Sequence, residues 1–263
     1  MNILCPTDLT LAADVALAYA GHIAKQTSGS VTLFHALGKK DAKGDGADLA
    51  KAHADVLGKL SGLGVKVDKL QREGAFMKEI VTEAGKGCKL MVAGTHGVQG
   101  LRQEMLGSDM LKLVRTVPVP TLVVQLYSKR KVAMDRIVMP VAGHTDIKPL
   151  LDAVCLLAKA YGAEVDVYQQ LVEGESTSNA LLKNKVAMID RLKKEGVRYN
   201  EVNEPVGKHF EGFATLTIRY AHKVGAGCIA VMAAASGEHK KIADKEKQEL
   251  LTNEKGIPVL CAV

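Results

Sequence analysis

The stretch that decides the fold is VAGTHGVQGLRQEMLGSDMLKLV, which spans residues 92–114. It begins as an apolar run typical of a buried strand, and the run breaks into glycines and a histidine between Gly94 and Gly97. After Gly107 and Ser108 the apolar residues recur at the three- and four-residue spacing of an amphipathic helix. The stretch therefore predicts a buried strand, a glycine-containing loop and a helix, in that order.

The sequence around this stretch repeats the alternation of β-branched runs and amphipathic segments. We expect strands at Asn2–Pro6, Ser30–Ala36, Val65–Leu70, Lys89–Gly94 and Pro120–Leu126, and helices at Leu11–Ile23, Asp48–Leu60, Met77–Ala84 and Asp109–Arg115. Strands that alternate with helices in this way predict an α/β fold with a doubly wound, five-stranded, Rossmann-like parallel sheet.

The same order of elements begins again in the second half of the chain. NILCP lies over RIVMP, so that Ile3 matches Ile137 and Pro6 matches Pro140. Further on, GKGCKLMVAGTHG lies over GAGCIAVMAAASG, and VPTLVV lies over IPVLCA. We interpret this as a tandem duplication and expect two domains, 1–127 and 135–263, joined by the polar stretch 127–135.

Composition narrows the class of protein. Hydrophobic residues make up 47% of the chain, with four Phe and no Trp, so we expect an aliphatic core of the kind that parallel sheets require. The net charge is +6, but the lysines are spread over helical faces without interleaved aromatic residues, which argues against nucleic-acid binding. The five cysteines lie in apolar segments without a CxxC pair, and no apolar run approaches ~18 residues. We expect a cytoplasmic protein with reduced cysteines that does not bind membranes.

The glycines of the quoted stretch favour a phosphate site. Ligands of open parallel sheets bind beyond the carboxyl ends of the strands, and glycines there let backbone N–H groups approach a ligand. The helix that follows Gly107 and Ser108 adds the positive end of its dipole. The alternative is that these are turn glycines and that Ser108 is an ordinary N-cap.

The spacing of Gly94, Gly97, Gly107 and Ser108, together with PTD after the first strand, resembles the nucleotide-binding branch of the universal stress protein family. The resemblance implies an adenine nucleotide alpha hydrolase-like fold, ATP as ligand with or without Mg²⁺, and two domains whose last strands pair as an internal pseudo-dimer. It implies that the three glycines and the serine surround the phosphates, with the PTD motif at the ribose or adenine side. The motif residues are Pro6, Thr7 and Asp8.

The resemblance also draws attention to five other residues near the implied site, most of which have two possible roles. Ala36 stands where the family usually has Val against the adenine. His96 lies inside the loop, where shaping the loop is the better reading than acid–base chemistry, and Arg102 could reach a phosphate or remain solvated. Gly74 could pass close to the nucleotide or simply turn the chain between strand and helix. Asp8 could cap the first helix, although Thr10 is the better cap.

The leading functional hypothesis is a stress-response protein that binds ATP or ADP and acts as a nucleotide-dependent regulatory module. The loop has no GK[ST] lysine, so an ATP hydrolase of useful rate is a weaker hypothesis. A structural or adaptor protein with a vestigial nucleotide site is the third. The sequence contains no GxSxG or HExxH motif, and CPTDLT lacks the dinucleotide GxGxxG. Protein partners and association into homodimers are left open.

The second copy lacks most of the implied site. Alignment of the repeats places Ala142 at Asp8, Ala234 at Gly94 and Ser236 at His96, and only Gly237 matches Gly97. Where Gly107 and Ser108 should recur, the copy reads ADKEKQELL, whose carboxylates we expect to repel a triphosphate. The sequence predicts one nucleotide per chain, while Ser236, Gly237 and Lys240 leave open a smaller anion in the second half.

Overall fold

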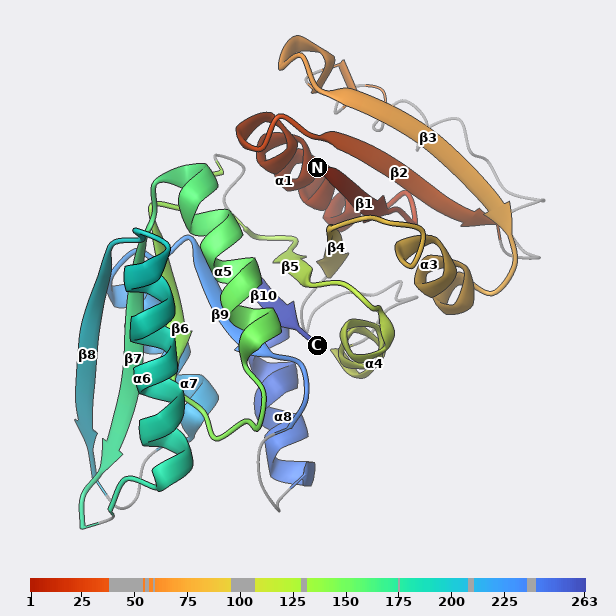
Figure 1. Ribbon diagram of the computed structural model, residues 1–263. Helices are drawn as coiled ribbons and strands as arrows, with labels where there is room; N and C mark the ends of the chain where they lie inside the picture. Colours follow the sequence, from red (N-terminus) through yellow and green to blue (C-terminus); the bar gives the residue numbers. More distant parts are fainter. Residues whose placement is uncertain are drawn as a thin grey trace.

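The computed structural model describes residues 1–37, 54, 57–58, 60–95, 107–128, 132–174, 176–207, 211–235 and 240–263 (Figure 1). In the first half the elements are β1 (Asn2–Pro6), α1 (Leu11–Gln26), β2 (Ser30–Leu37), β3 (Lys66–Glu73), α3 (Phe76–Ala84), β4 (Leu90–Thr95), α4 (Gly107–Thr116) and β5 (Thr121–Gln125). In the second half they are β6 (Arg136–Pro140), α5 (Lys148–Tyr161), β7 (Glu164–Val172), α6 (Asn179–Lys194), β8 (Tyr199–Val206), α7 (Phe213–Lys223), β9 (Cys228–Met232), α8 (Lys240–Leu251) and β10 (Val259–Ala262).

The strands form one sheet in the order β3-β2-β1-β4-β5-β10-β9-β6-β7-β8. Neighbouring strands are parallel within each half, and the halves meet where β5 and β10 pair antiparallel, with Leu122 opposite Leu260. The α/β class, the five parallel strands in each half and the pairing of the last strands are thus confirmed. The sheet is continuous across the joint, so the domain limits 1–127 and 135–263 stay a prediction.

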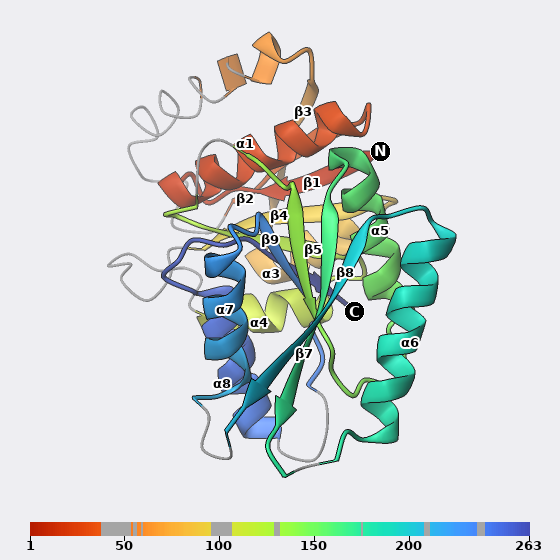
Figure 2. The same ribbon diagram turned by 90° about the vertical axis from the view of Figure 1, so that its left-hand side faces the viewer.

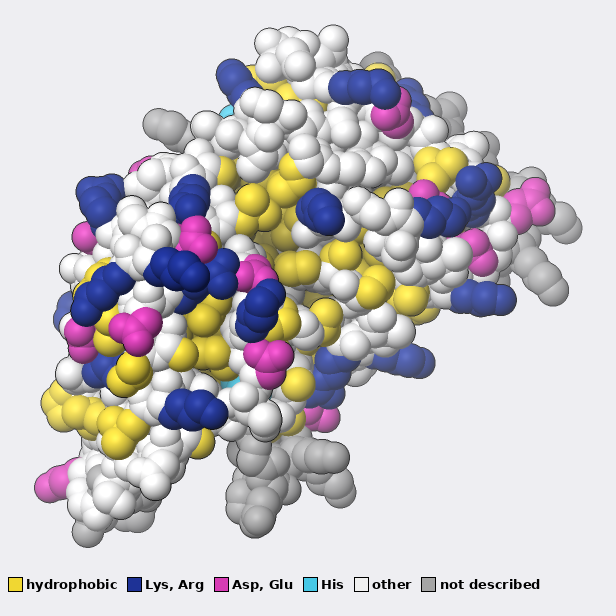
Figure 3. Space-filling view, viewed as in Figure 1, with side chains coloured by type: hydrophobic (Ala, Val, Ile, Leu, Met, Phe, Trp, Pro, Cys, Tyr) yellow, Lys and Arg dark blue, Asp and Glu magenta, His cyan; other side chains and the backbone are white. Residues whose placement is uncertain are grey.

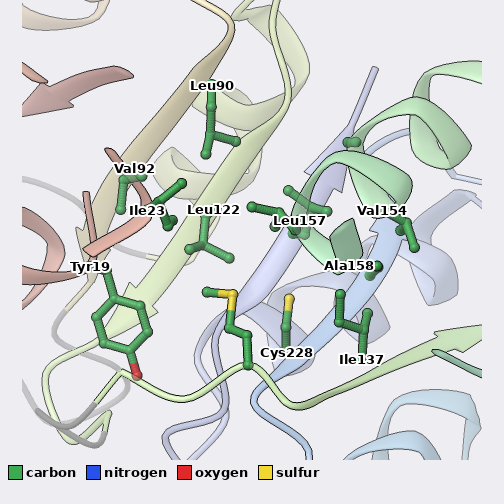
Figure 4. Packing of buried hydrophobic residues seen from close by; sticks show 14 of the residues in the cluster. Tyr19, Ile23, Leu90, Val92, Leu122, Ile137, Val154, Leu157, Ala158 and Cys228 are labelled. Atoms are coloured by element: carbon green, nitrogen blue, oxygen red, sulfur yellow. The ribbon is translucent and has the colours of Figure 1, made fainter. Parts of the chain in front are cut away.

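Helices cover both faces of the sheet (Figures 1 and 2). On one face, apolar residues of α1, α5 and α6 pack on the strands, and on the other face those of α3, α4, α7 and α8 do so. Each apolar layer runs from one half of the chain into the other. In the first layer Ile23 and Leu122 of the first half lie near Leu157 and Cys228 of the second (Figure 4). This shared core holds the two halves together as one body.

Polar contacts also cross the joint. Arg115 near the end of α4 donates from Nε to the carbonyl oxygen of Ala233, at 3.0 Å, and from Nη2 to Asp244 of α8, at 2.5 Å. The side-chain amide of Gln125 in β5 donates to the carbonyl oxygen of Leu251 at 3.0 Å. These contacts fix α4 against α8, so both helices keep their place over the central pair of strands.

Most expected elements are confirmed, with their ends displaced by one to three residues. The third strand runs from Lys66 to Glu73 rather than from residue 65 to 70, because its carboxyl end pairs with all of β2. Most of the helix expected at 48–60 lies outside the described residues. The joining stretch is partly buried although its sequence is polar: Met134 is fully buried in the shared core, and Ser128 is buried against Gln125. The five cysteines are free and buried, as expected.

Candidate functional site

The carboxyl end of β1 lies at the point where the winding of the first half reverses. Strand β1 pairs with β2 on one side and with β4 on the other, so the chain moves first one way along the sheet and later the other way. In open α/β sheets this reversal opens a crevice beyond the carboxyl ends of the two central strands. The expected PTD motif begins with Pro6, the last residue of β1, and Gly94 lies near the end of β4.

The turn after β1 is held by its own side chains. Asp8 Oδ1 accepts from the backbone N–H of Thr10 at 3.1 Å and from its hydroxyl at 2.6 Å. Thr10 in turn caps α1, because its hydroxyl oxygen accepts from the N–H of Ala13 at 3.4 Å. The expectation that Thr10 is the N-cap is confirmed. Asp8 orients the residue that caps the helix, and both hydrogen bonds that join Asp8 to described residues use Oδ1.

The backbone of this turn is strained at Leu9, which has φ +63°. A left-handed conformation costs roughly 1–2 kcal/mol for a residue with a side chain. Two contacts hold the turn: the hydroxyl oxygen of buried Thr7 accepts from the Leu9 N–H at 3.0 Å, and the Thr7 N–H donates to the carbonyl oxygen of Phe34 at 2.8 Å. Strain of this kind gathers at ligand sites. No feature of the sequence indicated it, because leucine is not a residue that favours positive φ.

His35 is a second feature of this edge that the sequence reasoning missed. Its Nδ1 lies 2.8 Å from the carbonyl oxygen of Thr7, so Nδ1 carries the proton of that hydrogen bond. The contact joins the end of β2 to the turn after β1 and fixes the orientation of the imidazole. The signal was available in SVTLFHA, where a polar residue comes directly before the expected end of a buried strand.

Gly94 is required by packing. A Cβ atom at this position would lie 2.3 Å from the carbonyl oxygen of Ala12 and 2.9 Å from the backbone nitrogen of Ala13. Real Cβ atoms do not come this close to backbone, so the glycine lets the first turn of α1 rest on β4. The end of β4 and the turn after β1 therefore meet around the start of α1. A ligand role of Gly94 stays a prediction.

Gly74 and Ala36 also have structural explanations. Gly74 has φ +150°, and an added Cβ would lie 2.7 Å from Oε1 of Glu79, so the turn into α3 calls for glycine. Ala36 is buried in the apolar layer on the α3 and α4 face of the sheet. The roles that the resemblance implies for these two residues toward a nucleotide remain predictions.

The helix expected after the loop begins at Gly107, so Ser108 lies within its first turn and its side chain is exposed. Asp109 follows in the same turn. The first N–H groups of α4 have no partner within the helix. Because α4 joins the parallel strands β4 and β5, we infer that it begins on the side of the sheet where β4 ends. The expected site residues His96, Gly97 and Arg102 lie outside the described residues.

The corresponding edge of the second half is built differently. Ala142 follows β6, and the side-chain amide of Asn184 in α6 donates to the carbonyl oxygens of Ala142, at 2.7 Å, and of His144, at 2.8 Å. Helix α5 begins only at Lys148, after a longer loop. The packing that requires glycine at position 94 is absent here: Ala234, which aligns with Gly94, is exposed.

The acidic residues of ADKEKQELL have partners in the fold. Asp244 pairs with Arg115. Glu246 accepts from the first N–H groups of α7, at 3.1 Å from Phe213 and 2.7 Å from Ala214. The hydroxyl of Thr215 donates to Glu249 at 2.6 Å. Each of these carboxylates therefore attaches α8 to a neighbouring element, and their repulsion of a triphosphate stays a prediction.

Comparison with known proteins decides the family. A family model described as the universal stress protein family matches residues 1–125. The first half of the chain belongs to the universal stress protein family. No curated protein matches the sequence.

Solved structures of universal stress proteins share the fold of the whole chain. One from Archaeoglobus fulgidus DSM 4304 has a TM-score of 0.72 at 16% identity, covering 99% of this chain and 97% of its own. A putative universal stress protein from Pseudomonas aeruginosa UCBPP-PA14 has a TM-score of 0.63 at 19% identity, covering 99% and 92%. The cytoplasmic domain of a prokaryotic cation chloride cotransporter also has this fold, with a TM-score of 0.54 at 10% identity, covering 100% and 95%. The fold therefore occurs in proteins of different kinds, and function has to be argued from the site.

Two surface features bear on partners. On the face shown in Figure 3, Lys and Arg side chains are scattered among Asp and Glu over both halves. Among the described helices, none combines the length and the apolar character that crossing a membrane requires.

Proposed function

We propose that this chain binds ATP or ADP at the carboxyl edge of β1 and β4 and serves as a nucleotide-dependent regulatory module in the cytoplasmic stress response. The observation that carries the proposal is the reversal of strand order at β1, which coincides with the PTD motif and with the glycine–serine spacing of the family. The second half contributes packing and has lost the nucleotide site.

The donor set of the described residues fits a nucleotide. Within the described part of the chain both hydrogen bonds of Asp8 use Oδ1, so Oδ2 would accept from a ribose hydroxyl. The first N–H groups of α4 suit phosphate oxygens, with the Ser108 hydroxyl beside them. Gly107 would allow close backbone approach to the phosphates. The resemblance adds Gly97 for a second close approach and Arg102 for a positive charge, and both lie outside the described residues. Bound Mg²⁺ would supply further charge neutralisation.

The alternatives differ in what they bind and what they release. An adaptor with a vestigial site binds no nucleotide, whereas a weak ATP hydrolase binds it and releases ADP. The packing role of Gly94 favours the adaptor hypothesis, because packing explains this glycine of the signature without a ligand. Nucleotide extracted from freshly purified protein after denaturation separates the adaptor from the other two. Time-resolved release of ADP then separates the regulatory module from the hydrolase.

A melting experiment with a matched pair of variants tests the site. At a hundredfold excess over its Kd, a ligand that binds only the native state adds about 2.7 kcal/mol of stability, so Mg-ATP should raise the melting temperature. Gly107→Val should abolish this rise, because its side chain would occupy phosphate space at the start of α4. The control, Asn179→Val, puts the same residue at the exposed first position of α6 and should keep the rise. Equal responses of the two variants would exclude the proposed site.

A further inference from the structure

The second half contains a small cavity at the carboxyl ends of β6 and β9, which correspond in the repeat to the strand ends that carry the proposed nucleotide site in the first half. Its walls are mostly apolar, and the side chains of His144 and Lys247 also line it. The lining residues are Pro140, Ala142, His144, Ile147, Leu150, Met188, Phe213, Val231, Met232 and Lys247. The space open to the centre of a water-sized group is about 10 Å³, so the cavity has room for one such group.

Lys247 is a costly residue in this position. It projects from α8, is only 7% exposed, and no hydrogen bond or ion pair joins it to another described residue. The neighbouring carboxylate of Glu246 is bound to the start of α7, and that of Asp244 is bound to Arg115. A buried lysine of this kind normally has a partner, because burial removes the water that stabilises its charge.

His144 also lines this cavity. Its Nε2 is buried and has no hydrogen-bond partner in the part of the chain that the structure describes. Burial, and next the charge of nearby Lys247, lower the pKa of this imidazole to about 4. At neutral pH the ring is therefore uncharged and can donate one N–H, while Lys247 supplies a positive charge next to it.

We propose that this cavity binds the oxygen end of a small anion, a carboxylate or a phosphate group, between the Lys247 ammonium and His144 Nε2. An oxyanion satisfies both groups and neutralises the buried charge, whereas a water molecule leaves that charge uncompensated. The small volume admits the anionic end only, and the apolar walls suit a compact ligand. The triphosphate of a nucleotide is too large for this space, so the ligand differs from the one proposed for the first half.

The test uses the full chain labelled with ¹⁵N-histidine, without nucleotide, titrated with sodium acetate or with sodium phosphate against sodium chloride at equal ionic strength. His144→Gln assigns the ring resonances. We expect acetate, phosphate or both to shift the His144 Nε2 resonance saturably and to raise the melting temperature. Lys247→Met should weaken this binding roughly tenfold or more, because a charge-assisted hydrogen bond is lost. Lys247→Gln provides a second neutral variant, and Lys223→Met, at an exposed lysine of α7, should behave as wild type.

Three results would overturn the proposal. A flat response to both anions means that the cavity holds water only. An equal response to chloride means a general effect of salt. Full binding in both Lys247 variants places the anion elsewhere. Acetate without phosphate, or the reverse, supports the proposal and identifies the source of the anion, and none of these outcomes depends on the nucleotide site in the first half.

Discussion

Replacement of Lys247 by methionine should stabilise the protein in the absence of any ligand. The side chain is almost fully buried, lines an apolar cavity and has no ion-pair or hydrogen-bond partner among the described residues. Methionine keeps a similar length and removes the charge. A buried charge without a partner normally lowers stability, and its replacement by an apolar group removes that penalty.

The size of the effect follows from the pKa of the lysine. Burial, as the largest cause, lowers the pKa of Lys247 from 10.5 to about 8. Each unit of difference in pKa corresponds to about 1.4 kcal/mol. Folding with Lys247 charged is therefore less favourable than folding with Lys247 neutral by about 3 kcal/mol. Below pH 8 both states carry the proton, so the full penalty is present. Between pH 8 and about 10.5 the folded state releases its proton first, and wild-type stability rises relative to the methionine variant.

Urea unfolding of wild type and Lys247→Met at a series of pH values measures this difference, because other titrating groups are common to both chains. We expect the variant to be more stable by about 3 kcal/mol at pH 7, with the gap closing as the pH rises from 8 to about 10.5. Lys223→Met should show neither effect. A less stable Lys247→Met, or a gap independent of pH, would mean that the lysine has a stabilising partner and would refute the reasoning.

Three further predictions concern the framework. Gly94→Ala should cost about 1–3 kcal/mol in urea unfolding because its Cβ meets the backbone of α1, whereas Gly62→Ala, with nothing within 4 Å, should cost nothing. Asp166→Ala should cost about 3–5 kcal/mol, because this fully buried carboxylate accepts two hydrogen bonds from an arginine, while Asp68→Ala at an exposed ion pair should change stability by less than about 1 kcal/mol. Because the folded pKa of His144, about 4, lies below its ordinary 6.5, wild-type stability should fall as the pH drops from 6.5 toward 4, and His144→Gln should lose that component of an acid titration.

The sequence predicts the framework because parallel strands covered on both faces must be apolar along their whole length. NILCP and RIVMP are such runs, and their match revealed the duplication. The edge strands were harder to delimit. In KVDKLQRE most side chains are exposed, so the apolar run alone ended the expected strand early, while the backbone pairs with β2 to Glu73.

The sequence predicts the site less completely, because its details depend on contacts between distant residues. The distance from Gly94 to Ala12 and the hydrogen bond from His35 to Thr7 both join separate elements. The partners of the acidic residues in ADKEKQELL could not be foreseen either. Glu246 binds the start of a helix that begins more than thirty residues earlier in the chain, and local spacing gives no sign of such a pair.

The two halves therefore diverge at the edge where ligands bind and agree where they pack. At β5 and β10 each half supplies the neighbour strand that the other lacks, so the last strands of both are already paired within one chain. The pairing of β5 with β10 depends on the strands and on the apolar layers beneath the helices. It does not depend on the sequence of the loops at the carboxyl ends of the strands. Those loops were free to change after duplication. In the first half Leu9 has a strained conformation, and the hydrogen bonds between Asp8 and other described residues leave its Oδ2 unused. In the second half the side chains of Asn184 and Glu246 bond backbone groups at this edge. The buried Nε2 of His144, which lines the cavity together with Lys247, has no partner among the described residues.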